Sequence, residues 1–174
     1  MADGLLNVLF LCTGNTARSV LAEAILRKDG AGRFRAHSAG SHPKGVVNPL
    51  ALSTLAAHGY PVDGLRSKSW DEFGAPEAPA MNFIFTVCDD AAGEACPFWP
   101  GHPATAHWGV ADPAAVSGAP EEKAHAFETA FRLLRARIAA FLALPFAALD
   151  SAALLARLRE IGRMDGATRR AHEA

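Results

Sequence analysis

The chain has 174 residues, half of them hydrophobic and a fifth charged, which is typical of one soluble globular domain and excludes a disordered chain. Its 17 basic and 18 acidic residues give a net charge of −1, so nothing in its charge favours nucleic acid or an anionic membrane as a partner. No apolar stretch approaches the ~20 residues needed to span a bilayer. The N-terminus lacks the pattern of a signal peptide, and we expect a cytoplasmic protein.

The first predicted elements are a strand, a short loop and a helix. "LLNVLFLC" (5–12) is a nearly continuous apolar run, typical of a strand buried on both faces. After a loop over 13–16, apolar residues recur at helical spacing. The sequence therefore predicts a strand that runs through a short loop directly into a helix.

Strands and helices continue to alternate along the chain. Further strands are predicted over 34–40, 81–88 and 105–110. Further helices are predicted from Asn48, as N-cap, to Gly59 and over 121–144, and a long Pro-containing loop is predicted over 89–104. This alternation predicts an α/β fold with a parallel sheet and helices on both of its faces.

The C-terminal part has weaker signals than the rest of the chain. Residues 149–166 can form one more helix, and the last residues, "ATRRAHEA" (167–174), look frayed. We therefore expect one domain over 1–148 and a helical extension over 149–174.

The loop after the first strand has the chemistry of an anion site. The first backbone N–H groups of a helix have no internal partners, and the helix dipole adds positive potential there. Gly14 lets the backbone approach an anion closely, and the planar fork of Arg18 can bind two of its oxygens. The same field is expected to lower the pKa of Cys12 well below the ~8.5 of a free cysteine. The pattern favours a nucleophile in an oxyanion cradle over a buried structural cysteine.

"LFLCTGNTARSVLAEAI" (9–25) resembles the phosphate-binding loop of the low-molecular-weight protein tyrosine phosphatase superfamily, which includes arsenate reductases of the same fold. The likeness continues through "HSAGSHPKGVVNPLALSTLAAHGY", "FIFTVCDDAAGEACP" and "AHWGVADPAA", and it covers about residues 5 to 145. It implies a four-stranded parallel sheet flanked by helices on both faces. It also implies that Cys12 is the nucleophile and Arg18 the oxyanion clamp. The implied oxyanion-binding loop consists of Thr13, Gly14, Asn15, Thr16, Ala17, Arg18 and Ser19, in which Asn15 and Ser19 hold the loop and tune the cysteine.

Both reactions known in this superfamily begin with attack of a thiolate on a tetrahedral centre. A phosphatase then needs a general acid and water, whereas a reductase needs a second thiol. Asp112 stands where the resemblance places the general acid. It is followed by Ala114 and Ala115, where typical tyrosine phosphatases have aromatic residues that stack on the phenol ring. This difference favours a small inorganic oxyanion as the substrate.

Two further cysteines favour reduction. Cys88 ends a predicted strand, at the edge of the sheet where Cys12 also lies, and Cys96 follows on the Pro-rich loop. The pair resembles the redox pair of thioredoxin-coupled arsenate reductases. Its spacing is one residue longer, and Ala17 stands where such enzymes usually have a second loop cysteine. The alternative is that Cys88 is a core cysteine and Cys96 is incidental.

We therefore predict an arsenate reductase that converts arsenate to arsenite through a thiol–disulfide relay. The predicted catalytic residues are Cys12, Arg18, Asp112, Cys88 and Cys96. The alternative is a low-molecular-weight protein tyrosine phosphatase or another phosphomonoester phosphatase. We expect no bound cofactor or metal, an external thiol reductant (thioredoxin or a glutathione-type thiol), and arsenate as ligand, with phosphate or sulfate as mimics.

Glu23 is open to two interpretations. With Asn15 and Ser38 it could bind a monovalent cation, as in some related reductases. A solvated helix face explains it more simply, because it lies outside the apolar stripe of its helix.

Overall fold

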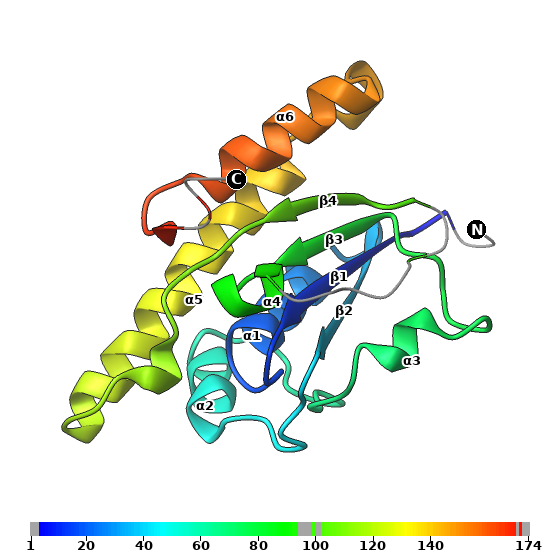
Figure 1. Cartoon of the computed structure of the whole chain (residues 1–174). Helices are drawn as coiled ribbons and strands as arrows, with labels where there is room; N and C mark the ends of the chain where they lie inside the picture. The colour runs from blue at the N-terminus through cyan, green and yellow to red at the C-terminus, as the bar shows by residue number, and fades with distance from the viewer. Residues whose placement is uncertain (1–3, 94–98, 100–101, 170, 172–174) are drawn as a thin grey trace.

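The computed structural model describes residues 4–93, 99, 102–169 and 171, which form a parallel α/β fold (Figure 1). The strands are β1 (Leu6–Cys12), β2 (Phe34–Gly40), β3 (Phe83–Thr86) and β4 (Ala104–His107). The helices are α1 (Arg18–Asp29), α2 (Pro49–Ala57), α3 (Asp71–Gly74), α4 (Asp89–Gly93), α5 (Pro120–Leu142) and α6 (Ser151–Gly162), with short 3-10 turns η1 (Pro113–Ala115) and η2 (Phe146–Ala148).

The sheet has the strand order β2-β1-β3-β4, and all of its pairs are parallel. In its register Cys12 pairs with Gly40, and Leu11 pairs with Thr86, which pairs in turn with His107. The carboxyl ends of the strands therefore meet at one edge. This confirms the predicted four-stranded parallel sheet, and the edge is where such sheets place their sites.

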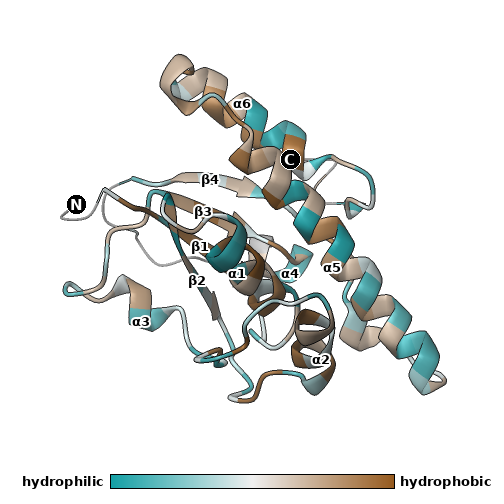
Figure 2. Ribbon diagram, turned by 180° about the vertical axis from the view of Figure 1, so that it is seen from behind, coloured by the Kyte–Doolittle hydropathy of each residue, from teal (hydrophilic) through white to brown (hydrophobic). Residues whose placement is uncertain are grey.

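Both faces of the sheet are buried, as the continuous apolar run of β1 predicts. Val8 and Phe10 belong to the large core shared with α1, α2 and α5. Leu9 and Leu11 point to the other face, which Phe73 of α3 helps to cover. Figure 1 shows α1, α2 and α5 on one side of the sheet and α3 on the other, and Figure 2 shows the hydrophobic strands between these layers.

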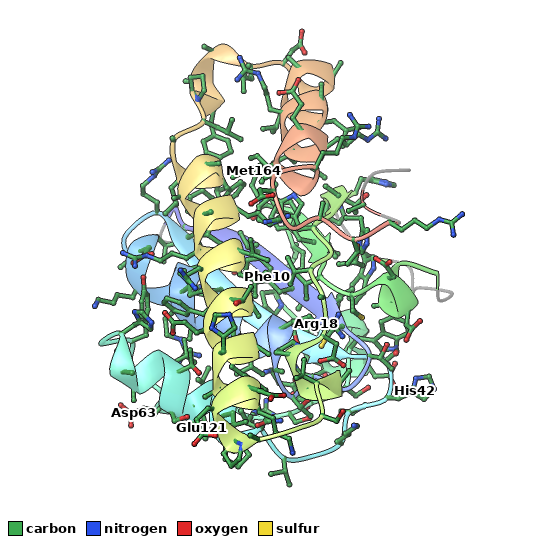
Figure 3. The ribbon with its side chains drawn as sticks, turned by 90° about the vertical axis from the view of Figure 1, so that its left-hand side faces the viewer. Phe10, Arg18, His42, Asp63, Glu121 and Met164 are labelled. Atoms are coloured by element: carbon green, nitrogen blue, oxygen red, sulfur yellow. The ribbon has the colours of Figure 1, made fainter. Side chains whose placement is uncertain are left out.

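The C-terminal segment packs against α5 and the end of β4. The indole N–H of Trp108, which directly follows β4, donates to the carbonyl of Leu158 in α6 at 2.9 Å. Arg137 of α5 is fully buried, and its guanidinium donates to the carbonyls of Met164 and Asp165 at 3.0 to 3.2 Å. Figure 3 shows Met164 where the chain leaves α6 beside α5.

Two expectations were wrong, one about the residues near the C-terminus and one about the segment after β3. Residues 167–168 are not frayed, because Ala167 forms a bridge with Val110 and the backbone N–H of Thr168 donates to the carbonyl of Gly109 at 3.1 Å. The segment over 89–104, expected to be a loop throughout, begins with α4. A helix of five residues is too short to show an apolar period in the sequence. Among the described residues, no helix is long and apolar enough to span a membrane.

Candidate active site

The loop between β1 and α1 wraps around the sulfur of Cys12. Asn15 lies in the left-handed region with φ 49°, a conformation that asparagine tolerates better than most residues. Its backbone N–H donates to Cys12 Sγ at 3.2 Å, and the hydroxyl of Ser19 lies 2.8 Å from the same sulfur. The structure thus brings the predicted nucleophile and two predicted loop residues together.

The loop carbonyls point away from this centre. They accept hydrogen bonds of 2.9 to 3.1 Å from the segment after β2, in the pairs His42 N–H to Thr13 O, Lys44 N–H to Gly14 O and Asn48 N–H to Thr16 O. The carbonyl and N–H of a trans peptide unit point in opposite directions, so the N–H groups of Gly14, Asn15 and Ala17 face the inside of the loop. Such a nest of N–H groups is suited to an oxyanion.

The side chain of Asn15, which is fully buried, fixes the loop to the strands beneath it. Its amide nitrogen donates to the hydroxyls of Ser19 at 2.8 Å and Ser38 at 3.0 Å. Its amide oxygen accepts the backbone N–H of Lys68 at 2.8 Å. Three of the four hydrogen-bonding positions of the amide are thus directed at different segments of the chain, which pre-organises the loop.

Gly40, at the end of β2, allows the loop to approach the sheet this closely. A Cβ at this position would overlap the carbonyl oxygen of Thr13 and lie 3.0 Å from the backbone nitrogen of Asn15. These are backbone atoms, so a side chain could fit only if the loop moved.

Gly40→Ala is therefore expected to lower the free energy of unfolding by about 2 kcal/mol, as overpacking of a tight contact does. It should also abolish the rise in melting temperature that we expect phosphate to give the wild type. Gly14→Ala is the matched control for stability, because its Cβ would meet only the flexible side chain of Lys44 at 3.5 Å. Thermal unfolding with and without phosphate tests both variants, and a wild-type response from Gly40→Ala would contradict this reading of the loop.

The expected lowering of the Cys12 pKa is wrong for the free protein. Burial raises the pKa of the Cys12 thiol above its ordinary value. The hydrogen bond with Ser19 and, more weakly, the charge of Arg18 lower the pKa without cancelling the effect of burial. The sequence shows which neighbouring groups can lower the pKa of a cysteine, but it does not show how completely the thiol is desolvated.

Arg18, the first residue of α1, faces the segment after β4. Its Nη1 donates to the carbonyl of Val110 at 2.9 Å, and its Nη2 lies 3.5 Å from Oδ2 of Asp112. The other carboxylate oxygen of Asp112 accepts the N–H of Ala114 at 2.9 Å and caps η1. The predicted clamp and the predicted acid thus lie together at the rim of the loop, where Figure 3 shows Arg18 beyond the end of β1.

Cys88 directly precedes α4 and lies beside the Cys12 loop. Its sulfur is 3.7 Å from Thr13 Oγ1 and accepts the N–H of Ala91 at 3.4 Å. Both Cys12 and Cys88 are buried free thiols. Cys96 lies outside the described residues.

Glu23 and Lys68 form a buried ion pair behind the loop that the sequence analysis missed. Glu23 is only 5% exposed, so the interpretation as a solvated helix face was wrong. Its Oε1 accepts a hydrogen bond from Ser38 and lies 3.5 Å from Lys68 Nζ, while Arg27 binds its Oε2 at 2.6 Å. Lys68 Nζ also lies 3.4 Å from Ser38 Oγ, so an ammonium group of the chain itself contacts two of the three residues considered for a monovalent cation.

A second polar cluster, also missed, lies on the other side of Cys88. Nε2 of His107 is 2.7 Å from Oδ1 of Asp89, and its Nδ1 is 2.7 Å from the hydroxyl of Thr86. A histidine at the end of β4 was visible in the sequence, but its carboxylate partner follows a different strand. No group of three or more potential metal ligands occurs among the residues that the structure describes.

Comparison with known proteins identifies the family of the chain. The family model described as low molecular weight phosphotyrosine protein phosphatase matches residues 7–153. The arsenate reductase of Shouchella clausii is 33% identical over 134 residues, which cover 77% of this chain and 93% of the relative.

Solved structures share the fold. An arsenate reductase in the phosphate-binding state has a TM-score of 0.66 at 24% identity, over 80% of this chain and 98% of that chain. A thioredoxin-dependent arsenate reductase of Corynebacterium glutamicum has a TM-score of 0.54 at 23% identity, over 80% of this chain and 64% of that chain. The family match spans most of the chain and includes the loop, Arg18 and Asp112. The chain therefore belongs to the low molecular weight phosphotyrosine protein phosphatase family.

Proposed function

We propose that this protein is an arsenate reductase in which Cys12 is the nucleophile and Cys88 supplies the second thiol. The observation that carries the proposal is the position of Cys88, a buried thiol 3.7 Å from a residue of the Cys12 loop. Hydrolysis of a phosphocysteine needs no second thiol, whereas reduction through an arsenylated cysteine needs a second thiol to attack its sulfur. The name of the 33% identical relative supports the same assignment.

In the first step, the loop N–H groups and Arg18 hold arsenate, and the thiolate of Cys12 attacks the arsenic. An As–S bond forms and an As–OH bond breaks, and the departing hydroxyl takes a proton from Asp112 and leaves as water. The arsenate dianion can accept the thiol proton of Cys12 as it binds, so a raised pKa in the free protein does not prevent attack.

In the second step, the thiolate of Cys88 attacks the sulfur of Cys12. An S–S bond forms while the As–S bond breaks, and its electron pair stays on arsenic, which leaves as arsenite. Two thiols are oxidised to a disulfide as As(V) becomes As(III), so the electrons balance without a bound cofactor.

The Cys12–Cys88 disulfide is then passed on within the chain before an external thiol reduces it. Cys96 attacks Cys88 and releases Cys12 as a thiol, which leaves a Cys88–Cys96 disulfide for thioredoxin or, failing that, a glutathione-type thiol. The thioredoxin dependence of the Corynebacterium glutamicum enzyme is consistent with this relay. The cytoplasm, where thiols are kept reduced, is the compartment in which such a cycle can run.

A single turnover tests this proposal. The fully reduced protein is mixed with arsenate in the absence of external thiol, arsenite is quantified, and disulfides are mapped by mass spectrometry. We expect about one arsenite per chain and a Cys88–Cys96 bond, the stoichiometry of an internal two-electron relay. Arsenite formed only with added glutathione would contradict the internal relay. No arsenite under either condition, together with hydrolysis of a phosphomonoester, would make the protein a phosphatase.

A further inference from the structure

The segment after α6 returns to the rim of the candidate active site. Ala167 forms an antiparallel bridge with Val110, whose carbonyl accepts the hydrogen bond of Arg18 at 2.9 Å. The backbone N–H of Thr168 donates to the carbonyl of Gly109 at 3.1 Å. This segment is held from behind by the buried guanidinium of Arg137, as described above. The matched family region ends at residue 153, so these contacts are made by a part of the chain beyond it.

The side chain of Thr168 reaches the start of α4. Its hydroxyl donates to Oδ1 of Asp89 at 2.5 Å, and His107 Nε2 lies 2.7 Å from the same oxygen. Gly109 permits this convergence, because a Cβ there would overlap the Thr168 hydroxyl and lie 2.6 Å from His107 Nε2. Two segments that are distant in the sequence, one at the end of β4 and one after α6, therefore meet on one carboxylate.

Asp89 is the residue that follows Cys88. Isolated helices as short as the five residues of α4 have almost no stability of their own, so external contacts must fix where α4 begins. The sulfur of Cys88 also accepts the N–H of Ala91 within this helix, so a shift of α4 would move the thiol relative to the Cys12 loop.

We propose that Thr168 is a positioning residue for Cys88: through its hydrogen bond to Asp89 it fixes the start of α4 and holds the Cys88 thiol beside the Cys12 loop. The part of this inference that concerns arsenite release rests on the proposed function. The placement of Cys88 does not, and it can be measured without arsenate.

Thr168→Val removes the hydroxyl and keeps the shape of the side chain. Thr168→Ser restores a hydroxyl, and Thr105→Val makes the same change at an exposed position of β4. The full-length reduced proteins are labelled with iodoacetamide, and peptide mapping reports the rate at each cysteine. Cys88 is only 2% exposed, so its rate reports how often α4 opens.

We expect Thr168→Val to raise the labelling rate of Cys88 about tenfold, the factor that corresponds to one hydrogen bond to a charged group. The rate at Cys12 should stay within about twofold of the wild type, because the loop contacts are unchanged. Thr168→Ser and Thr105→Val should behave as the wild type. An unchanged Cys88 rate, or an equal rise at Cys12, would overturn the proposal.

The single turnover with arsenate is the second readout. If the wild type releases arsenite, Thr168→Val should slow that release about tenfold, and an unchanged rate would overturn the positioning role. If the wild type releases none, the proposed function fails, while the labelling rates still decide whether Thr168 positions Cys88.

Discussion

Replacing Cys88 by serine is expected to lower the single-turnover yield of arsenite at least about 100-fold, because a hydroxyl without an activating base is a far weaker nucleophile than a thiol. The substitution is nearly isosteric, and the sulfur accepts only a weak hydrogen bond from the N–H of Ala91 at 3.4 Å. We therefore expect phosphate to raise the melting temperature of Cys88→Ser as much as that of the wild type, since the oxyanion-binding loop is unchanged. The measurement is arsenite per chain after rapid mixing, beside thermal unfolding in phosphate.

Cys96→Ser is the matched control for this prediction. The relay assigns Cys96 only to the step after arsenite has left, so this variant should still give about one arsenite per chain, but with a Cys12–Cys88 disulfide and no further turnover. A full yield from Cys88→Ser would show that another thiol attacks Cys12. A full loss from Cys96→Ser would place Cys96 before arsenite release.

The sheet could be predicted from the sequence because its signals are local. The apolar run of β1 and the boundaries of β2 at Phe34 and Gly40 follow from residues within a few positions of each other. The same holds for Cys12 and Arg18, which one short loop and the start of one helix bring together. Local patterns of this kind predict both an element and a site when the chain places them next to each other.

The rest of the site could not be predicted because its partners come from distant segments. Lys68 reaches Glu23 across 45 positions, and Thr168 reaches Asp89 across 79. A charged residue that lies outside an apolar stripe normally faces water, and only the tertiary structure shows that Glu23 faces a buried ammonium instead. The pKa of Cys12 was misjudged for the same reason, since complete desolvation depends on packing from several elements.

The ion pair of Glu23 and Lys68 supports the oxyanion loop through Ser38. Ser38 donates to Glu23 and accepts from the amide of Asn15, so one chain of hydrogen bonds connects the ion pair to the residue that holds the loop. Burial lowers the pKa of Lys68, while the charge of Glu23 opposes that shift. Desolvation thus outweighs the attraction for Lys68, and the pair as a whole is expected to add little stability over an uncharged pair of similar size.

Removing only one partner of the ion pair is expected to destabilise the fold, because the other charge then stays buried without its counter-charge. Lys68→Met is expected to lower the free energy of unfolding by about 3 kcal/mol, at the low end for a broken buried pair, since Arg27 still binds the second oxygen of Glu23. Arg66→Met is the matched control: it removes a cation from an exposed pair with Glu72, whose side chains are 61% and 44% exposed, and should cost less than about 1 kcal/mol.

The decisive variant is the double substitution Glu23→Gln with Lys68→Met, which removes both buried charges and keeps an amide to accept from Ser38. Urea unfolding should show it to be more stable than Lys68→Met alone by at least about 1 kcal/mol, the coupling expected of two charges in contact. Equal or lower stability of the double variant would mean that other groups compensate the charge of Glu23 when Lys68 is lost. The loop would then depend on Lys68 only through its backbone N–H, which donates to Asn15 at 2.8 Å whatever side chain it carries.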